Sequence, residues 1–431
     1  GYNAAAAAVV FLLSLCVHLA VAWAIGQHTQ QISDFGNALE LSRGDFPLTE
    51  TPDHYRIFSN WGIYPLYLKL IQELFGYGAF TAIVLNALIC AVSSMLIYIL
   101  CRLGFQDERV GFLGALIYTF WPSHLLYSVI LSPEFLNIFL TLLFMVLLEM
   151  LIGRYHKRSV YGMTCLAAVV LSLAGFFKQI DKIILIASGI MFVILILQKK
   201  FLICKKTFLI LALFAGCYIL SGKLIYAGLD YAYGETVNRN PAMHFIYIGL
   251  NPETYGVWSD EVFHVYPQNV KDCNYDFKQA SDLTFTRLKE EIAEKKHLQF
   301  PYFAEKFRTA WADNSEIWWV DVTLRDDSAF LKKTHWLDQM SIFTQNFWMV
   351  ICILICAEAV FLFVNPRERY MYMWLILFGF ACLLTLSEVQ SRYKCVVYPV
   401  LSILAADGIV KLLKLLKNVF FSLQQTGKRL Y

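Results

Sequence analysis

Ten long runs of apolar residues dominate the sequence. Only four Asp, Glu, Lys or Arg residues fall inside them, namely Glu149, Glu358, Asp407 and Lys411. About 20 mostly apolar residues are needed for a helix to cross a bilayer, and lipid leaves no backbone polar group unpaired. The pattern therefore predicts an all-α polytopic membrane protein with about ten transmembrane helices. We place the runs at 4–26, 78–100, 110–130, 135–152, 160–177, 183–198, 207–222, 342–364, 370–387 and 396–413.

The composition excludes several other classes of protein. Of the 431 residues, 58% are hydrophobic and 16% are charged, whereas a soluble domain usually carries about a quarter charged residues. A soluble enzyme, a disordered chain and a secreted disulfide scaffold are therefore excluded. Only one of the 11 cysteines, Cys273, lies away from the apolar runs, so these cysteines do not form a disulfide framework.

Lysines and arginines between the runs predict the orientation in the membrane. They are concentrated in 101–109, 153–159, 199–206, 365–369 and the tail from 414. Because cytoplasmic loops are enriched in basic residues, both termini are expected in the cytoplasm. No Asn-x-Ser/Thr glycosylation acceptor occurs, which favours the inner membrane of a bacterium. The polar segments that connect the runs at their other ends are then expected on the outer face of the membrane.

Three parts are expected. Residues 1–222 form an N-terminal transmembrane module that includes a first outer loop at 27–77, and 342–431 form a C-terminal transmembrane module with a basic cytoplasmic tail. Residues 223–341 form an outer-face soluble domain of mixed or α-rich structure, with an amphipathic helical pattern near 281–311. This domain holds 13 Lys and Arg against 18 Asp and Glu, so it is not a nucleic-acid surface.

Acidic residues stand in two outer turns. Asp34 follows the first run by eight residues, and Glu134 opens the fourth run after Ser132 and Pro133. A carboxylate at the mouth of an apolar hairpin is costly unless it is paired or functional. Asp34 is as well explained as a solvated or helix-capping carboxylate. Glu134 is explained as the first-turn acid of a helix that Ser132 caps, with Pro133 at the first helical position.

Basic residues stand in the other two outer turns. Lys178 and Lys182 flank a short connection, and Arg392 lies with Glu388 and Tyr393 before the last run. A guanidinium binds phosphate with two parallel hydrogen bonds, so these residues are candidates for an anionic lipid phosphate. Lysines at such positions also reach lipid headgroups without further function, and Tyr393 fits an interfacial aromatic belt.

Several motifs resemble the membrane-embedded GT-C glycosyltransferases, close to the bacterial protein mannosyltransferase and aminoarabinose transferase group. They are SDFGNALELSRGD with Asp34, Tyr64-Pro65-Leu66-Tyr67, WPSHLLYSVILSPEFL with Glu134, IGLNPETYGVW, FPYFAEKFRTAW and SEVQSRYKCVVYPVLSILAADGI. The likeness runs over most of the chain. The sequence departs from the family in lacking a paired Asp-Glu in the first loop, since Phe35 follows Asp34.

The resemblance implies a GT-C fold and an inverting transfer of a hexosyl or pentosyl group on the outer face. The donor would be a polyprenyl-phosphate sugar such as an undecaprenyl-phosphate sugar, and the acceptor a glycan, a lipid-linked molecule or a protein. Asp34 would be the general base. Arg392, Lys178 and Lys182 would bind the donor phosphate.

Further residues receive supporting roles from the same resemblance. Glu388, Tyr393, Tyr64 and Tyr67 would support the site, with Glu388 orienting Arg392. Glu134 matches a second acidic position, which in some members helps to hold a divalent cation, Mg²⁺ or Mn²⁺. Other members need no metal, so the cation stays open.

Two other classes of function remain as alternatives. A lipid or glycan transporter or flippase would place polar or broken helices at the bilayer midplane. A non-catalytic scaffold would use the outer domain to bind a partner. The near absence of charge inside the runs, and the gathering of polar residues at one face, favour the transferase over the transporter.

Overall fold

The computed structural model describes residues 3–44, 53–198, 205–312, 315–325 and 336–428, and the side chains of all of these except Asn60, Ser315 and 420–428. The described chain is almost entirely helical, and its only β-bridges are Thr29–Leu324 and Val257–Val389. The longer helices are α1 (Ala4–Ala24), α4 (Ser59–Phe75), α5 (Ala79–Leu100), α6 (Glu108–Thr119), α8 (Glu134–Gly153), α9 (Val160–Phe177), α10 (Asp181–Leu197), α11 (Lys205–Tyr233), α15 (Phe277–Lys295), α16 (Phe300–Ala312), α19 (Trp336–Val364), α20 (Glu368–Leu386) and α21 (Tyr398–Lys428).

Shorter elements connect these helices. They are η1 (Gly26–His28), α2 (Ser33–Leu41), α3 (Asp53–Ile57), η2 (Cys101–Phe105), α7 (Pro122–Tyr127), α12 (Ala242–Gly249), α13 (Asp260–Phe263), α14 (Val265–Asp272), α17 (Ser315–Thr323) and η4 (Ser391–Val397).

Eight helical segments of the described chain are long and apolar enough to cross a membrane. Two of the ten predicted runs do not reach that length. The run at 183–198 corresponds to α10, which has 17 residues. The run at 110–130 is divided between α6 and α7, because Pro122 begins a new helix and cannot continue the one before it. The count of ten spans therefore stays a prediction.

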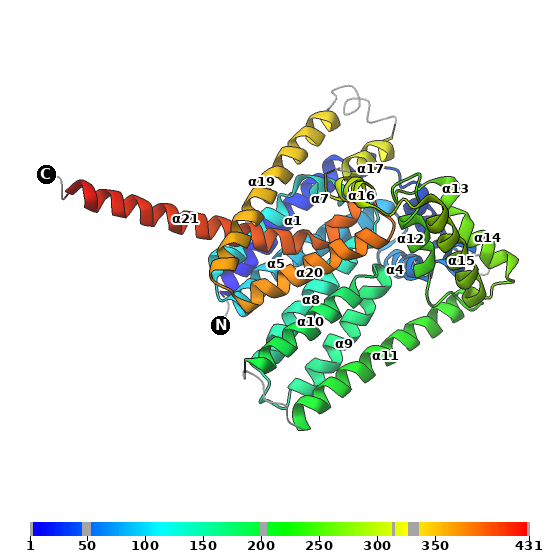
Figure 1. Cartoon of the computed structure of the whole chain (residues 1–431), viewed down its shortest axis with the longest axis horizontal. Coiled ribbons are helices and arrows are strands. Elements are labelled where there is room, and N and C mark those ends of the chain that lie inside the picture. The colour runs from blue at the N-terminus through cyan, green and yellow to red at the C-terminus, as the bar shows by residue number, and fades with distance from the viewer. Residues whose placement is uncertain (1–2, 45–52, 199–204, 313–314, 326–335, 429–431) are drawn as a thin grey trace.

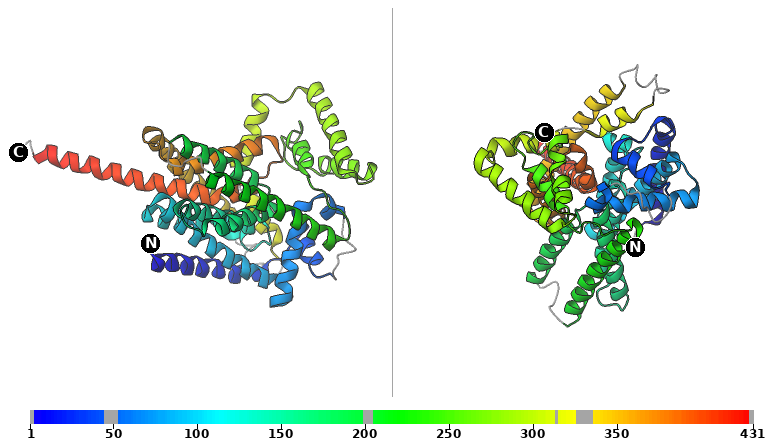
Figure 2. Two further views of the ribbon diagram at one scale, coloured as in Figure 1. Left: turned by 90° about the horizontal axis from the view of Figure 1, so that it is seen from below. Right: turned by 90° about the vertical axis from the view of Figure 1, so that its right-hand side faces the viewer.

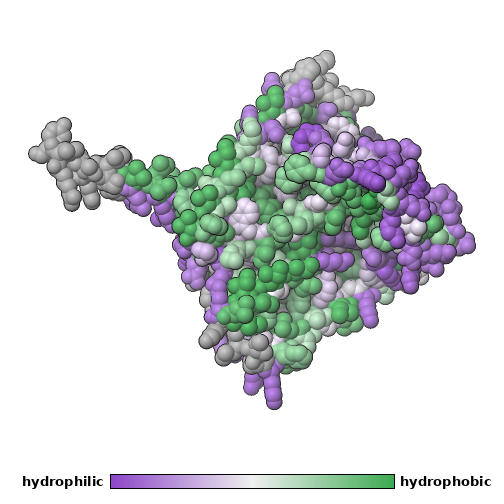
Figure 3. All heavy atoms as spheres, viewed as in Figure 1, coloured by the Kyte–Doolittle hydropathy of each residue, from purple (hydrophilic) through white to green (hydrophobic). Residues whose placement is uncertain are grey.

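The apolar helices pack side by side as a bundle (Figure 1). In one half, α1 packs on α5, α5 on α8 and α8 on α9, while α11 packs along α9. In the other half, α21 packs between α6 and α19, and α10 packs against α20. An apolar surface covers the visible face of these helices (Figure 3).

Polar helices gather at one end of this bundle. Helices α12, α13, α14 and α15 lie together there, at the right of Figure 1, and Figure 3 shows a hydrophilic surface over them. The start of α1 and the free end of α21 lie away from this polar end, and α21 extends beyond the bundle (Figures 1 and 2). Both termini thus lie at the end of the bundle opposite to the polar helices.

All four charges predicted to lie inside the apolar runs form ion pairs. Arg369 Nη2 lies 3.0 Å from Glu149 Oε2. Lys411 Nζ lies 3.3 Å from Glu358 Oε1 and 2.5 Å from Asp407 Oδ2. Charges in a bilayer are tolerated where they neutralise one another, and each of these four charges has an opposite charge within the bundle.

Candidate functional site

A cavity of about 610 Å³ lies between the polar end and the apolar bundle. Its walls come from segments far apart in the sequence: the first outer loop, residues 244–264, helices α16 and α17, and residues 388–393. Four of the predicted site residues line it: Asp34, Glu388, Arg392 and Tyr393. The fold therefore joins the first outer loop and the last outer turn around one cavity.

Asp34 lies in the first turn of α2 and is half-buried. The turn before it is held tightly, since Gln31 donates from Nε2 to Val129 O at 3.0 Å and accepts at Oε1 from Leu131 N at 2.9 Å. Ser33 has a φ of 53°, a conformation that non-glycine residues seldom adopt outside functional sites and turns. No described residue forms an ion pair or hydrogen bond with the Asp34 carboxylate, which leaves it available to a substrate.

Arg392 is buried in η4 with its guanidinium surrounded by aromatic rings. Its Cζ lies 4.8 Å from the ring centre of Trp319 and 5.2 Å from that of Phe35. Its Nη1 donates to the hydroxyl of Tyr127 at 3.3 Å. Aromatic faces stabilise a desolvated cation, so a permanent positive charge is held rigidly at the wall of the cavity.

Gln390 connects Arg392 to Glu388. Arg392 Nε donates to Gln390 Oε1 at 2.7 Å, and Gln390 Nε2 donates to Glu388 Oε1 at 2.6 Å. Burial raises the pKa of the Glu388 carboxyl. The link between Glu388 and Arg392 therefore runs through a neutral amide.

Two of the motifs described above, IGLNPETYGVW and FPYFAEKFRTAW, hold the segment 388–392 in place. The amide N–H groups of Glu388 and Val389 donate to Phe245 O and Gly256 O, each at 2.8 Å. The buried Lys306 donates from Nζ to Gly249 O, and a Cβ on Gly256 would lie 2.8 Å from that nitrogen. The glycines of IGLNPETYGVW thus allow the close approach of FPYFAEKFRTAW and of residues 387–389.

Lys178 and Glu134 lie together beside the site. Lys178 Nζ is 3.3 Å from Glu134 Oε1, and the Ser132 hydroxyl donates to Glu134 Oε2. The ammonium also lies 3.6 Å from the ring centre of Tyr393. Lys178 therefore adds a second positive charge next to the segment 388–392, which carries Arg392.

Lys178 also lines a second, mostly apolar cavity of about 180 Å³. Its apolar walls come from the α9–α10 turn, α12 and α20, and include Phe177, Ile246 and Leu383. Glu388 and Tyr393 line both cavities, so the apolar cavity adjoins the first one.

The remaining predicted residues lie further from the cavity. Tyr64 and Tyr67 lie on α4, with ring centres 5.8 Å apart, and the Tyr67 ring is 6.3 Å from that of Phe177. The Tyr67 ring helps to pack α4 against α9, Tyr64 is buried, and neither residue lines either cavity. Lys182 lines a different cavity from Arg392 and Lys178.

A divalent cation does not fit the residues that are present. Within the described ranges, no group of three or more His, Cys, Asp or Glu side chains is placed to hold a metal ion. Glu134, the residue that the resemblance offers as a ligand, is already paired with the Lys178 ammonium and the Ser132 hydroxyl. We therefore derive no step of a reaction from a metal.

The structure adds residues to the site that the sequence did not indicate. His54 and His244 line the cavity with Asp34, and His54 Nε2 and His244 Nδ1 are buried without a hydrogen-bond partner in the described structure. Burial lowers the pKa of His54, against the opposing effect of the Asp34 carboxylate, and lowers that of His244 to about 3. Both imidazoles are therefore neutral near pH 7. Neither stands in a motif or at a ligand spacing that could have revealed it.

Comparisons with known proteins agree with this architecture. No protein-family model matches the chain, and no curated protein matches it in sequence. Among solved structures, it is similar to the oligosaccharyltransferase AglB from the archaeon Archaeoglobus fulgidus, in complex with an inhibitory peptide and a dolichol-phosphate, with a TM-score of 0.50 and 13% identity. The similarity covers 96% of this chain and 52% of that protein, so this chain spans about half its length. AglB is a glycosyltransferase of the GT-C fold, and at this level of identity the likeness concerns the fold alone. The described chain is thus almost entirely helical and shares its fold with this oligosaccharyltransferase.

Proposed function

We propose that this chain is a membrane glycosyltransferase that transfers a sugar from a polyprenyl-phosphate donor to a hydroxyl group of an acceptor. One observation carries the proposal: Asp34, a carboxylate with no ion-pair or hydrogen-bond partner among the described residues, and a buried arginine, Arg392, line the same cavity. A general base and a phosphate-binding cation are the two groups that such a displacement requires.

The reaction follows from this placement. Asp34 accepts the proton of the acceptor hydroxyl, whose oxygen attacks the anomeric carbon of the donor sugar. The bond from that carbon to the phosphate oxygen breaks, and the phosphate leaves with the electron pair. Because the acceptor oxygen attacks from the opposite face, the configuration of the anomeric carbon is inverted. Arg392 and Lys178 stabilise the charge of the leaving polyprenyl phosphate. A positioned base of this kind accelerates a reaction by about 10²–10⁴-fold.

The second cavity supports a lipid donor. A nucleotide sugar is soluble and needs no apolar channel, whereas a polyprenyl chain must lie in an apolar environment up to its phosphate. The apolar cavity lined by Phe177, Ile246 and Leu383 is also lined by Lys178, and it shares Glu388 and Tyr393 with the cavity of Asp34. In the orientation predicted by the basic loops, this site lies on the extracytoplasmic face of a bacterial cytoplasmic membrane.

The proposal is tested with the purified full chain and short-chain polyprenyl-phosphate glucose and mannose as donors. Release of polyprenyl phosphate, with water as the accepting hydroxyl compound, is measured for the wild type and for Asp34→Asn, Arg392→Gln and Glu40→Gln. Glu40 lies on the same helix as Asp34, is exposed and lies outside the cavity, so its variant is the matched control. We expect Asp34→Asn to lose at least about 100-fold in rate while Glu40→Gln keeps the wild-type rate. Wild-type rates for Asp34→Asn would refute the mechanism.

A further inference from the structure

Lys182 belongs to a cationic cavity of about 300 Å³, separate from the cavity of Asp34. The end of α9, the start of α10 and the second half of α11 form its walls, together with Arg239 and Asn240. Three cationic side chains from three different segments line it: Lys182, Lys223 and Arg239. Their separation in sequence means that the fold itself brings these charges together.

The positive charge of this cavity is only partly compensated. Arg239 forms an ion pair with Asp230 and lies with its Cζ 4.6 Å from the ring centre of Tyr226. Asp181, the one carboxylate lining the cavity, is buried and accepts a hydrogen bond from the Tyr218 hydroxyl. Lys182 and Lys223 are exposed and have no ion-pair partner in the described part of the chain. The two lysines therefore leave the cavity with positive charge that no ion pair of the described chain neutralises, and such charge attracts an anion.

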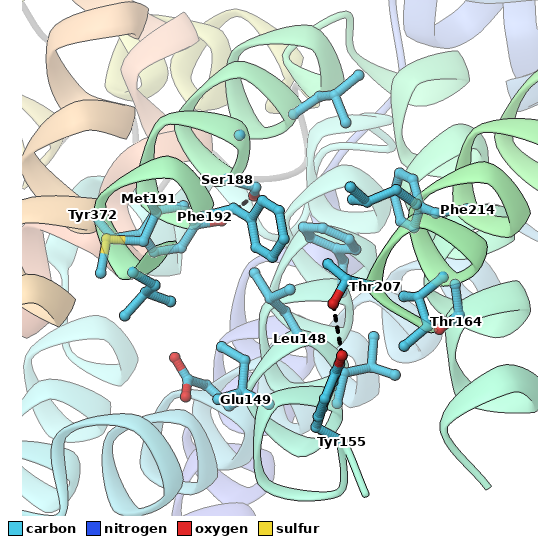
Figure 4. A pocket seen from close by; sticks show the side chains of 18 of the residues that line it. Leu148, Glu149, Tyr155, Thr164, Ser188, Met191, Phe192, Thr207, Phe214 and Tyr372 are labelled. Carbon is cyan, nitrogen blue, oxygen red and sulfur yellow. Dashed lines mark hydrogen bonds between the residues drawn. The ribbon is translucent and has the colours of Figure 1, made fainter. Parts of the chain in front are cut away.

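An apolar cavity of about 210 Å³ is lined by other residues of α9, α10 and α11, together with residues of α8 and α20. Phe214 of α11 lines this apolar cavity, Tyr218 lines the cationic one, and their rings are stacked with centres 6.3 Å apart. The two cavities are therefore separated by one helical turn. Figure 4 shows the apolar cavity between side chains of α10, such as Ser188 and Phe192, and of α11, such as Phe214.

Helix packing explains why this space exists. Helix α11 packs along α9, whereas α10 packs against α20, so α10 and α11 diverge and leave a cleft between them. Gly189 of α10 lines the apolar cavity, and a Cβ at this position would meet nothing within 4 Å. At the far end of the cavity, Glu149 is paired with Arg369, so no unpaired charge faces the apolar space there.

We propose that the cleft between α10 and α11 binds an anionic phospholipid. Its phosphodiester lies among Lys182, Lys223 and Arg239, and one acyl chain passes Tyr218 into the apolar cavity beside Phe214 and Gly189. Cationic side chains that lie beside an apolar cavity at the end of membrane helices are suited to bind an anionic phospholipid. A soluble anion would leave the apolar cavity unused, and a zwitterionic lipid would place its own cation among three others. The inference is independent of the proposed function, whose donor site is lined by Arg392 and Lys178.

The test measures lipid binding by the purified full chain in detergent, using native mass spectrometry. The probes are phosphatidylglycerol, phosphatidylcholine, a polyprenyl phosphate and inorganic phosphate. The variants are Lys182→Gln with Lys223→Gln, and Gly189→Leu, which fills the apolar cavity. The controls are Lys278→Gln with Lys289→Gln on α15, and Gly162→Leu, since Gly162 on α9 also has open space at its Cβ but lies outside the cavity.

We expect the wild type to prefer phosphatidylglycerol over phosphatidylcholine. The double lysine variant should lose roughly tenfold in affinity for phosphatidylglycerol, Gly189→Leu should also bind it more weakly, and both controls should bind it like the wild type. Equal binding of the two phospholipids, or unchanged binding by the double lysine variant, would overturn the proposal. Displacement of the phospholipid by equimolar inorganic phosphate would also overturn the proposal and assign the cations to a soluble phosphate. Preferential binding of the polyprenyl phosphate that is lost in the double lysine variant would overturn it as well, and would assign the cations to that lipid.

Discussion

Lys178 and Glu134 form an ion pair in which Nζ lies 3.3 Å from Oε1, at the point where the apolar cavity meets the turn before α8. Glu134 is 1% exposed, so it depends on this lysine for charge compensation. The same ammonium is the one that would meet the donor phosphate. The contributions of Lys178 to stability and to sugar transfer can be separated by substituting both Lys178 and Glu134.

Lys178→Met should therefore lower both stability and transfer. Removing the cation leaves a buried carboxylate unpaired, which costs about 2 kcal/mol, measured by denaturation in detergent. In Lys178→Met combined with Glu134→Gln, the unpaired charge is gone, so most of the stability should return while transfer stays low. Recovery of transfer in the double variant would show that Lys178 acts only by neutralising Glu134.

The pairing of Glu134 also predicts metal independence. Lys178 supplies the positive charge beside Glu134 that a divalent cation would otherwise supply. Prolonged treatment with EDTA should leave the rate of sugar transfer unchanged, with a known Mg²⁺-dependent transferase treated in parallel as the control. A loss of activity that Mg²⁺ or Mn²⁺ restores would contradict this expectation.

Gln390 should matter for the proposed reaction through Arg392. Its side chain accepts from Arg392 Nε at 2.7 Å and donates to Glu388 at 2.6 Å. Gln390→Met keeps the size of the side chain and removes both bonds, so kcat/KM should fall about tenfold, equivalent to about 1.4 kcal/mol. Gln268→Met, which removes a single exposed bond to Asp272 on α14, is the matched control. An unchanged kcat/KM would mean that the aromatic rings alone orient the guanidinium.

Much of the fold was predictable because the membrane restricts the choices. Spans must be apolar and helical, so most helix positions follow from the apolar runs, and polar turns at one end of a bundle must lie near one another. That reasoning anticipated that the turns with Asp34 and Arg392 would lie at the same end. It could not predict that Lys178 and Lys182 line different cavities, because this depends on the path of the backbone between them. Helix α9 ends at Phe177, Lys178 is extended, and α10 begins at Asp181.

Finer features depended on contacts between distant segments. The sequence near 281–311 indicated one amphipathic pattern, which the structure divides into α15 and α16. We expected the Ser132 side chain to cap α8, and this prediction is wrong. Helix α8 has no side-chain cap, and the Ser132 hydroxyl donates to the Glu134 carboxylate instead. His54 joins the cavity through packing against Phe58 and Phe263, and no local pattern encodes such packing.

Lys306 predicts a pH dependence of stability. Burial lowers the pKa of this lysine to about 7, against the opposing effect of Glu388, whereas in the unfolded chain its pKa is about 10.4. Between these values the unfolded state holds a proton that the folded state lacks, so the free energy of unfolding rises with pH, by up to about 1.4 kcal/mol per unit. Between pH 7 and 9, the wild type should gain stability relative to Lys306→Met, measured by thermal unfolding. Lys278→Met, at an exposed position on α15, should follow the wild type; parallel curves for Lys306→Met would contradict the shift.

The buried charges between α19 and α21 should stabilise the bundle as a unit. Lys411 Nζ lies 3.3 Å from Glu358 Oε1, and Trp374 Nε1 donates to Glu358 Oε2 at 2.7 Å. Either Glu358→Gln or Lys411→Met alone leaves charge uncompensated in an apolar region, so each should cost about 3 kcal/mol in unfolding by detergent. The double variant keeps only the Asp407 charge facing Arg367, so its loss should be clearly smaller than the sum of the two single losses. Because the pair lies beside the short α19–α20 connection, away from the Asp34 cavity, sugar transfer by the protein that remains folded should be unchanged. Additive losses would show that Glu358 and Lys411 act independently.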